Sequence, residues 1–548
     1  MTDNAVTRTP FAATRRQLLA GGAAVAAVSL TTTRATSAHA APAVAPASTV
    51  AAPAAPTSRP GGGIDRGTIQ RWARDTWTSM VAMTDPRTGL PADNISGPLK
   101  SPIRSGYTSP TNIGGYMWST VIARELGIIS ARECRTRLTQ TLTTLKTMKH
   151  HEPSGMFYNW YDEANGDVVT VWPENGSAVP AFLSSVDNGW FAAALMVVRN
   201  AEPTVAGLAN SLLSKMNFGM FYNKDARPVA AAGLLRGGFW DVKPIDPPDT
   251  APSFVAGNYL GNGPDVFYTN NHYDILVSEP RIATYIGIAH GQIPPAAYYA
   301  TMRTFPDDWD WAEQKPVGVH RTYYGTDVFE GAFTYRGMHI VPSWGGDMFE
   351  ALMPDLFVPE ASWAPRSWGI NHALTVRAQR EHGLDEAKYG YWGFSPASKP
   401  GGGYSEWGVD AIGMRADGYP SDMERTDYDA GNGTRVGVNP TPTWGDGVVT
   451  PHAAFLAMQY EPRQAYDNLV KIERDLEAYG EGGFYDAVAV KSGVIAKRYL
   501  SLDQAMVLGA IGNVFCDNVI RRHFIKGEIQ SRIKPLIGIE QFGAGVIS

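Results

Sequence analysis

Along most of the chain, apolar residues recur at the three- and four-residue spacing of α-helices. This pattern predicts helices within 113–129, 131–148, 188–201, 204–216, 279–291, 452–480 and 502–524. Strand-like alternation of apolar and polar residues is sparse by comparison. The chain is therefore expected to be all-α.

Several of these segments begin with residues that favour a helix N-terminus. A hydroxyl or carboxylate side chain can accept a hydrogen bond from the first free N–H groups, and proline suits the first helical position. Such starts occur at Ser109-Pro110, Asp187, Thr450-Pro451 and Ser501-Leu502-Asp503. We expect each of them to start a helix, with Asp187 as an N-cap.

A short phrase of glycine, aromatic and polar residues recurs between the helical segments. It reads GMFYNWYD at Gly155, GMFYNKDA at Gly219, GGFWDVKP at Gly237 and GGFYDAVA at Gly482, with a looser relative, YGYWGFSP, at Tyr389. Its recurrence suggests helix–loop–helix units, and its irregular spacing argues against a tandem solenoid. We predict an all-α (α/α)6 toroid, six helical hairpins closed into a ring, with long aromatic-rich loops on one face. The alternative is that these turns only fix loops to the core.

Aromatic residues make up 11% of the chain, with 15 Trp, 24 Tyr and 20 Phe. Many stand beside Asp, Asn or Gly, as in FPDDWDWAE and YSEWGVD, which is typical of a wet, concave surface. A buried core explains Trp118 or Phe455 better than it explains Trp309, Trp311 or Trp407. Because sugar faces stack on aromatic rings while their hydroxyls bind polar groups, this pattern indicates a carbohydrate site.

The first 40 residues read as an export signal of the twin-arginine type. TRRQLLAGGAAVAAVSL joins two arginines to an apolar run, and small residues follow at 37–40. The run from Leu18 to Leu30 is shorter than the roughly 20 residues that a membrane span needs, so we expect a secreted protein without a membrane anchor. Residues 41–63 are expected to be an Ala/Pro-rich linker, and residues 64–548 a single catalytic domain.

The charge of the chain and its two cysteines limit the partners and the covalent links that can be expected. The net charge is −6, and removal of the N-terminal arginines would make it more negative, which argues against a nucleic-acid partner. Cys134 and Cys516 are expected to be either two buried thiols or one disulfide.

No cofactor or metal is expected. The chain has no phosphate loop, no H-E-x-x-H and no G-x-S-x-G, and its histidines are scattered. The acidic loop Thr426 to Gly433 is the alternative, as a calcium site.

The segment SWGGDMFEALMP, Ser343 to Pro354, closely resembles the SWxGxMFExLMP phrase of the glucoamylase-like domain found in bacterial endo-β-1,2-glucanases and in the central part of cyclic β-1,2-glucan synthases. Further blocks resemble that domain in the same order: SPTNIGGYMWSTVIARELG at Ser109, SSVDNGWFAAALMVV at Ser184, SEPRIATYIGIAHG at Ser278, GFSPAS at Gly393, GVVTPHAAFLAM at Gly447 and YLSLDQAMVLGAIGN at Tyr499. The resemblance implies an (α/α)6 toroid that cleaves or rearranges glucans through carboxylic acids. Two positions depart from the family pattern, since Phe182 and Pro396 stand where relatives carry glutamates.

Glycoside hydrolysis needs a carboxyl group that donates a proton to the leaving oxygen and a second carboxylate that acts as nucleophile or base. Glu279 is the first candidate, because Ser278 and Pro280 around it predict a helix start. The resemblance implies that Glu279 is the general acid, and a helix-capping carboxylate is the alternative. Its candidate substrate-binding neighbours are His272, Tyr273, Asp274 and Arg281.

Asp187 and Glu350 are the candidates for the second catalytic carboxylate. Asp187 has a counterpart in the relatives, and a purely capping role is its alternative. Glu350 belongs to the matched phrase, and Asp347, three residues earlier, would share its helix face. Asp347 and the nearby Trp344 are expected to bind substrate.

The weaker candidates lie in glycine-rich aromatic phrases. Asp241 and Glu406 could bind sugar hydroxyls or could satisfy backbone donors of their own loops. The remaining candidate sugar contacts are the tryptophans of these and related phrases: Trp160, Trp190, Trp240 and Trp407.

Together these features predict a secreted glycoside hydrolase that acts within a β-glucan and takes a poly- or oligosaccharide as its partner. A transglycosylase on the same fold, a polysaccharide lyase with bases from NNHY at Asn270, and a non-catalytic glycan-binding protein are the alternatives. The absence of an evident Arg and Lys cluster argues against a lyase that acts on uronates.

Overall fold

The computed structural model describes residues 63–96, 98–99, 103–226, 233–244, 254–305, 314–414 and 444–547. The predicted export signal, nearly all of the predicted linker, Trp309, Trp311 and the loop from Thr426 to Gly433 lie outside these residues. In the part that is described, none of the helices combines the length and the apolar composition that a membrane crossing requires.

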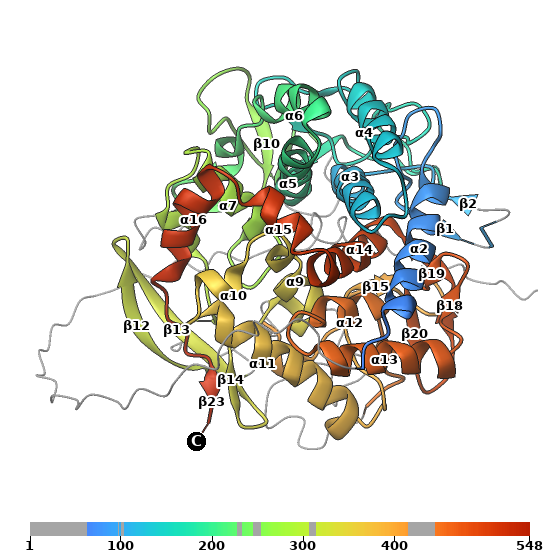
Figure 1. Ribbon diagram of the computed structural model, residues 1–548. Helices are drawn as coiled ribbons and strands as arrows, with labels where there is room; N and C mark the ends of the chain where they lie inside the picture. Colours follow the sequence, from blue (N-terminus) through green and yellow to red (C-terminus); the bar gives the residue numbers. More distant parts are fainter. Residues whose placement is uncertain are drawn as a thin grey trace, which may run out of the picture.

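Helices form the body of the molecule (Figure 1). Their bounds are α2 Arg66–Met83, α3 Pro110–Glu125, α4 Ala131–Leu145, α5 Ser185–Ala201, α6 Ala206–Leu213, α7 Arg281–Ala289, α8 Ala296–Ala300, α9 Met348–Leu352, α10 Glu360–Trp363, α11 Trp368–Glu381, α12 Pro451–Ala457, α13 Pro462–Asp475, α14 Ser501–Phe515, α15 Val519–Phe524 and α16 Glu528–Gly538. The predicted segments 452–480 and 502–524 each divide into two helices. The first divides at Pro462, and the second divides near Asn518, whose backbone is left-handed.

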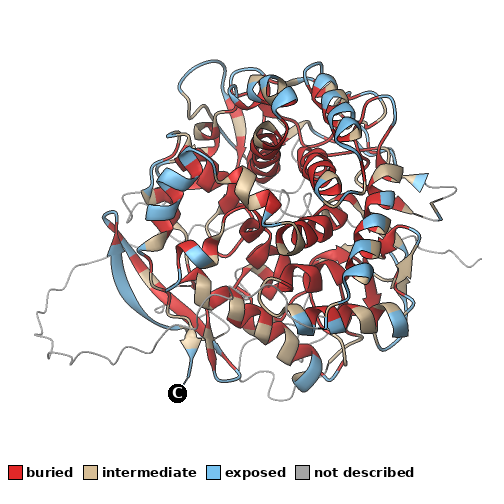
Figure 2. Cartoon of the chain, viewed as in Figure 1, coloured by how far each residue is buried: buried red, intermediate tan, exposed pale blue. Residues whose placement is uncertain are grey.

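The helices α3, α5, α7, α9, α12 and α14 form an inner set. Side-by-side contacts join α3 to α5, α5 to α7, α9 to α12, α12 to α14, and α14 back to α3. The helices α2, α4, α6, α11, α13 and α16 lie outside them (Figure 1). Figure 2 shows the inner helices buried almost throughout, whereas the outer helices expose one side. This difference follows from the sequence, because an all-apolar helix is covered on every side and an amphipathic helix on one.

Small residues let the inner helices approach closely. A Cβ atom on Gly115 of α3 would lie 2.9 Å from the Cβ atom of Ala505 in α14. A Cβ atom on Gly189 of α5 would lie equally close, 2.9 Å, to that of Ala283 in α7. Glycine is therefore required at these two contacts, where the helix backbones nearly touch.

Short antiparallel strands fill the connections between helices, and this part of the fold corrects the expectation of a purely helical protein. Their bounds are β1 Asn94–Ser96, β2 Ile103–Arg104, β3 His150–His151, β4 Met156–Phe157, β5 Phe182–Ser184, β6 Tyr222–Asn223, β7 Leu234–Arg236, β8 Gly238–Trp240, β9 Phe254–Gly257, β10 Val266–Thr269, β11 His272–Tyr273, β12 Val317–Tyr323, β13 Thr326–Tyr335, β14 Met338–Ile340, β15 Ala397–Ser398, β16 Tyr404–Ser405, β17 Val448–Val449, β18 Tyr479–Gly480, β19 Gly483–Phe484, β20 Ala487–Ala489, β21 Ile495–Ala496, β22 Arg498–Leu500 and β23 Gly545–Val546. Two four-stranded sheets have the orders β5-β8-β10-β9 and β12-β13-β14-β23. The first leads directly into α5, and the second lies at the edge of the molecule beside the C-terminus (Figure 1).

The two cysteines are free thiols, so the disulfide alternative is wrong. Cys134 is buried in α4, and burial raises the pKa of its thiol to about 11. This thiol is therefore protonated and unreactive at neutral pH.

A buried carboxyl lies where the β12–β13 sheet meets the C-terminal segment. Glu330 of β13 is fully buried, with its Oε2 atom 3.8 Å from Nε of Arg303. Arg303 also pairs with Glu540, whose Oε1 atom lies 2.8 Å from Nε. Burial, opposed by Arg303, raises the pKa of Glu330 from its ordinary value near 4.5 to about 8.

This raised pKa predicts that stability falls as the pH rises. Between pH 4.5 and 8 the folded protein holds a proton on Glu330 that the unfolded chain has released, so the free energy of unfolding decreases with pH in that window. Replacing Glu330 by Gln should lessen this decrease in denaturant titrations at pH 5, 7 and 9. Glu540, whose pKa burial also raises, accounts for the remainder. The exposed Glu174→Gln variant is the control and should keep the wild-type slope. An unchanged slope in Glu330→Gln would show that Glu330 ionises normally.

Candidate functional site

The N-terminal ends of the inner helices meet at one end of the ring. At this end Thr111 of α3 contacts Asp187 of α5, Trp190 of α5 contacts Glu279 before α7, and Glu279 contacts Glu350 of α9. At the same end, the starts of α9 and α12 both bind the backbone of residues 393–394. His452 of α12 faces Asp503 of α14, and the backbone N–H of Ser501, the first residue of α14, binds the carbonyl oxygen of Asp93 beside α3. Because helix N-termini favour negative charge, the acids of the chain gather here for a physical reason.

Glu279 is held from two sides. The indole N–H of Trp190 donates to Oε2 of Glu279 over 2.7 Å, and the backbone N–H of Glu279 donates to Oε2 of Glu350 over 2.5 Å. Ser278 adds a hydroxyl hydrogen bond of 3.0 Å to the same Glu350 oxygen. Glu279 is only 4% exposed. The carboxyl therefore has a fixed orientation just before α7, which begins at Arg281 with Pro280 as its N-cap.

Glu350 and Asp347 support this arrangement. Asp347 is the N-cap of α9, and its Oδ1 atom accepts the backbone N–H of Glu350 over 2.8 Å. The carboxylate of Glu350 in turn accepts from Glu279 and Ser278. Both acids are buried and act on the start of α7 through these contacts. A direct role in substrate binding or chemistry stays a prediction for each.

Asp187 is not the N-cap of α5, contrary to the expectation. Ser184 caps this helix, and its Oγ atom accepts the backbone N–H of Asp187, which is the third helical residue. Oδ1 of Asp187 accepts the hydroxyl of Thr111 over 2.6 Å. Since Asp187 lies one helical turn before Trp190, the same face of α5 presents a carboxylate and the indole that holds Glu279.

His272 and Tyr273 form the short strand β11 before Glu279, Asp274 follows it, and all three are half-buried. Asn223 donates its amide to Nε2 of His272 over 3.0 Å, which places the ring proton on Nδ1. Burial, aided by the nearby Arg236, lowers the pKa of His272 to about 4. His272 is therefore a neutral hydrogen-bonding group at neutral pH.

Arg281 does not face the substrate side as predicted. It is 4% exposed, and its guanidinium binds both oxygens of Glu360 at 2.8 and 2.9 Å. It also donates to the carbonyl oxygens of Glu350 and Ala351 at 2.7 and 2.6 Å. Arg281 thus joins α7 to α9. Every contact that it makes is internal.

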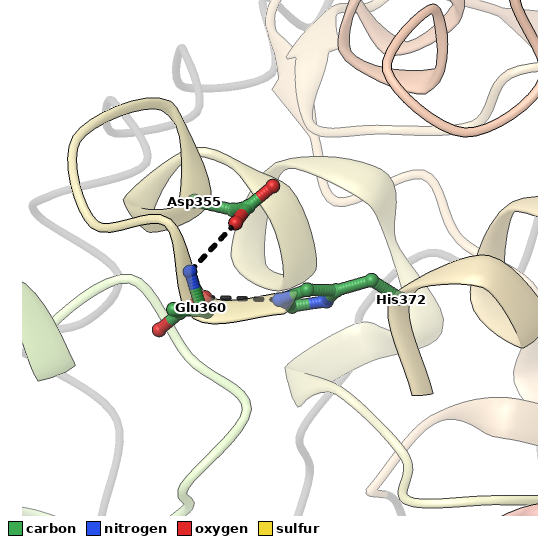
Figure 3. A group of neighbouring side chains, drawn as sticks. All are labelled: Asp355, Glu360 and His372. Carbon is green, nitrogen blue, oxygen red and sulfur yellow. Dashed lines mark hydrogen bonds and ion pairs between the residues drawn. The ribbon is translucent and has the colours of Figure 1, made fainter. Parts of the chain in front are cut away.

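Glu360, Asp355 and His372 form a buried group that resembles a metal site in composition (Figure 3). Figure 3 shows that Glu360 contacts both of the other residues: its carboxylate bonds to the His372 ring over 2.9 Å, and its backbone N–H bonds to Asp355 over 3.1 Å. The remaining contacts come from four further side chains: Arg281 and Tyr285 on Glu360, Arg521 and Tyr460 on Asp355.

These contacts leave no place for an ion among Asp355, Glu360 and His372. Burial alone would raise the pKa of Glu360, but Arg281 and His372 hold this pKa at about 2. Two arginines already neutralise the two carboxylates. The group is therefore an ion-pair network and not a metal centre.

A second group of the same composition lies between the starts of α12 and α14 and contains His452, Asp486 and Asp503. Sequence reasoning missed it, because the three residues come from separate segments. The signal was present in the repeated phrase GGFYDAVA, which carries Asp486, and in the two late family blocks, which carry His452 and Asp503 at helix starts.

The tryptophans proposed as sugar contacts lie mostly inside the protein. Trp190 is fully buried and serves Glu279, and Trp407 is 1% exposed in a small apolar cluster, so the wet position expected for Trp407 is wrong. Trp160 packs against the rings of Tyr107 and Trp172. Trp344 alone among these predicted tryptophans is half-buried in the described part of the chain.

Trp240 and Asp241 lie at the end of β8, next to β5. The ring of Trp240 lies 4.9 Å from that of Phe182, the residue that departs from the family pattern. Oδ2 of Asp241 accepts the hydroxyl of Tyr158 over 2.5 Å. Phe182 and Asp241 are half-buried and accessible, whereas Glu406 is buried.

Comparisons with known proteins agree with the motif resemblance. Residues 313–528 match a family described as "Putative glucoamylase", and residues 71–226 match one described as a protein of unknown function (DUF3131). The cyclic β-(1,2)-glucan synthase NdvB of Rhizobium meliloti is 23% identical over 83% of this chain, which spans only 18% of that relative's length. The resemblance to the glucoamylase-like domain is confirmed.

Solved structures share the fold at low sequence identity. The endo-β-1,2-glucanase from Chitinophaga pinensis is 15% identical with a TM-score of 0.57, covering 86% of this chain and 98% of its own. The β-1,2-glucanase from Parabacteroides distasonis (16%, TM-score 0.58) covers 87% and 61%, and the endo-β-1,2-glucanase from Talaromyces funiculosus in complex with sophorose (12%, TM-score 0.57) covers 86% and 90%. The α/α toroid is thereby supported, and the count of six hairpins stays a prediction.

Proposed function

We propose that this protein is a secreted glycoside hydrolase that cleaves β-1,2-linked glucan within the chain, with Glu279 as the general acid. The observation that carries the proposal is the position of Glu279 at the N-terminal ends of the inner helices: Trp190 donates to its carboxyl, and Glu350 accepts its backbone N–H. The substrate class comes from the β-1,2-glucanases that share the fold and from the β-1,2-glucan synthase.

The hydrogen bond from Trp190 determines which oxygen of Glu279 carries the proton. Oε2 accepts the indole N–H, so the transferable proton belongs on Oε1. As the proton passes to the leaving sugar oxygen, negative charge develops on Glu279, and the adjacent N-terminus of α7 stabilises it. The start of α7 thus favours proton donation over retention.

Asp187 is the proposed second carboxylate. It stands on the same face of α5 as Trp190, and the hydroxyl of Thr111 orients it. Glu350 is the proposed positioning residue, because its carboxylate accepts the backbone N–H of Glu279. His272 would bind a sugar hydroxyl through its Nδ1–H. Its lowered pKa makes it a poor base at neutral pH, which disfavours a lyase that depends on it.

Product analysis on a panel of glucans tests the proposal. Linear β-1,2-glucan should yield saturated oligosaccharides with new reducing ends, whereas β-1,3- and β-1,4-glucans should remain intact. Cyclic or elongated products without net reducing ends would assign a transglycosylase. Unsaturated ends that absorb ultraviolet light would assign a lyase, and binding without products would leave a glycan-binding protein.

Trp190→Phe tests how Glu279 is positioned. The variant keeps an aromatic ring in the core but removes the N–H donor, so kcat should fall by about 10- to 100-fold with little change in KM. Because the lost bond stabilises the ionised carboxylate, the basic limb of the pH–rate profile should move to higher pH. The matched control is Trp118→Phe, which removes another buried indole N–H, bonded to the carbonyl oxygen of Ala505. Equal losses in both variants would mean that Trp190 contributes only packing.

A further inference from the structure

A histidine and two aspartates come together at the N-terminal ends of α12 and α14. His452 is the second residue of α12, Asp503 is the third of α14, and Asp486 lies between β19 and β20. One ligand atom from each residue lies within 4.8 Å of the other two, and Nδ1 of His452 is 3.5 Å from Oδ2 of Asp503. All three side chains are buried.

Asp486 is the informative member of this group. It is 3% exposed, and its Oδ2 atom accepts the backbone N–H of Ser398 over 2.6 Å. Its Oδ1 atom has no hydrogen-bond partner among the described residues, and no Lys or Arg of that part of the chain pairs with it. The next residue in the chain, Ala487, belongs to a small buried apolar cluster with Ala397, Trp407, Val448, Ala489 and Ala496. A buried carboxylate in such surroundings requires a compensating positive group.

The ion-pair network around Glu360 contains the positive side chains that the group around Asp486 lacks among the described residues. That network has the same composition, one histidine and two acids, but two arginines and two tyrosines occupy its acids. Among the described residues, no arginine or lysine side chain forms an ion pair with Asp486, whose Oδ2 atom accepts a backbone N–H instead. The two groups therefore differ in the source of their positive charge.

We propose that His452, Asp486 and Asp503 bind a divalent transition-metal ion of the Zn²⁺ type. An imidazole nitrogen and two carboxylate oxygens are a common donor set for such ions, and two carboxylates neutralise a dication. Ca²⁺ fits less well, because it prefers oxygen ligands throughout. The ion would join α12 and α14 to the β19–β20 turn and so close this part of the ring.

Metal analysis of the purified full-length protein tests the site first. After dialysis into metal-free buffer and addition of one equivalent of Zn²⁺, Mn²⁺ or Ca²⁺, elemental analysis should find about one Zn²⁺ or Mn²⁺ per chain and less Ca²⁺. Saturating Zn²⁺ should also raise Tm by at least about 2 °C. Absence of bound ion and of any Tm shift with all three ions would overturn the proposal.

Asp486→Asn then locates the ion. The amide oxygen can still accept the Ser398 N–H, so folding should survive, but Zn²⁺ affinity should fall at least about 10-fold. Glu163→Gln, which changes another buried acid outside the group, should bind Zn²⁺ like the wild type. Asp503→Asn serves if Asp486→Asn does not fold. Unchanged Zn²⁺ binding in a folded Asp486→Asn or Asp503→Asn variant would place the ion elsewhere and overturn the proposal.

Discussion

Replacing Glu279 by Gln should lower kcat on linear β-1,2-glucan by about 10³-fold, within the range that general acids contribute. The amide oxygen of glutamine can still accept the indole N–H of Trp190, so the side chain should keep its place. Its NH2 group cannot supply the proton that the leaving sugar oxygen needs. Affinity for the glucan should therefore change only a few-fold, as measured by calorimetry on the inactive variant.

Glu350→Gln changes the partner of the Glu279 backbone N–H and serves as the comparison for Glu279→Gln. Its amide oxygen can still accept the backbone N–H of Glu279, so the loss in kcat should be much smaller, about 10-fold. Reducing-end assays on both variants under identical conditions make the comparison. Near-normal turnover in Glu279→Gln, or a larger loss in Glu350→Gln, would contradict the assignment of the acid.

Replacing Arg281 by Met should lower the free energy of unfolding by about 3–5 kcal/mol, because it leaves Glu360 buried without its main counter-charge. The variant also removes the donors to the carbonyl oxygens of Glu350 and Ala351, so the link from α7 to α9 weakens. Urea titration measures the loss. If the loosened link displaces Glu279, kcat should fall as well, even well below the unfolding midpoint.

Two controls separate this effect from a general cost of removing an arginine. Arg336→Met breaks a partly exposed pair with Glu381 and should cost under about 1 kcal/mol. In a double-mutant cycle, Arg281→Met combined with Glu360→Gln should cost clearly less than the sum of the single changes. Additive losses, or a loss for Arg281→Met as small as that for Arg336→Met, would show that the buried pair contributes little.

The predictions from local sequence patterns held where a cap precedes a long apolar segment. α3 begins at Pro110 after the Ser109 cap, as expected. The start of α5 was misplaced, because Ser184 and Asp187 are both capping residues and only the backbone decides which one lies outside the helix. The strands were missed because most span two to four residues, too short for an alternating pattern to emerge.

Long-range pairing explains the errors in the candidate site. The position of Glu279 before a helix could be predicted because its neighbours in sequence, Ser278 and Pro280, mark a helix start. Its role as the acid stays a prediction from the family resemblance. Arg281 was predicted to bind substrate because it lies close to Glu279 in sequence. Its actual partner, Glu360, lies 79 residues away, and no local sequence pattern predicts their pairing. His452, Asp486 and Asp503 were missed for the same reason, since only the ring brings their three segments together.

The aromatic composition agreed with a carbohydrate-active protein but did not show which tryptophans lie at the surface. Trp190 and Trp407 stand beside polar residues in sequence, yet both are buried. In a helix or a tight loop, adjacent residues point to different sides, so a polar neighbour does not place a tryptophan at the surface. Trp190 nevertheless contacts the proposed general acid, through its hydrogen bond to Glu279.

The role of Glu279 as proton donor is tested most directly by comparing two leaving groups in Glu279→Gln. The sugar hydroxyl that leaves from β-1,2-glucan needs a proton, whereas nitrophenolate leaves readily without one. On a nitrophenyl glycoside of β-1,2-linked glucobiose the variant should retain kcat within about 10-fold of the wild type, while it loses about 10³-fold on the glucan. Equal losses on the two substrates would contradict proton donation by Glu279.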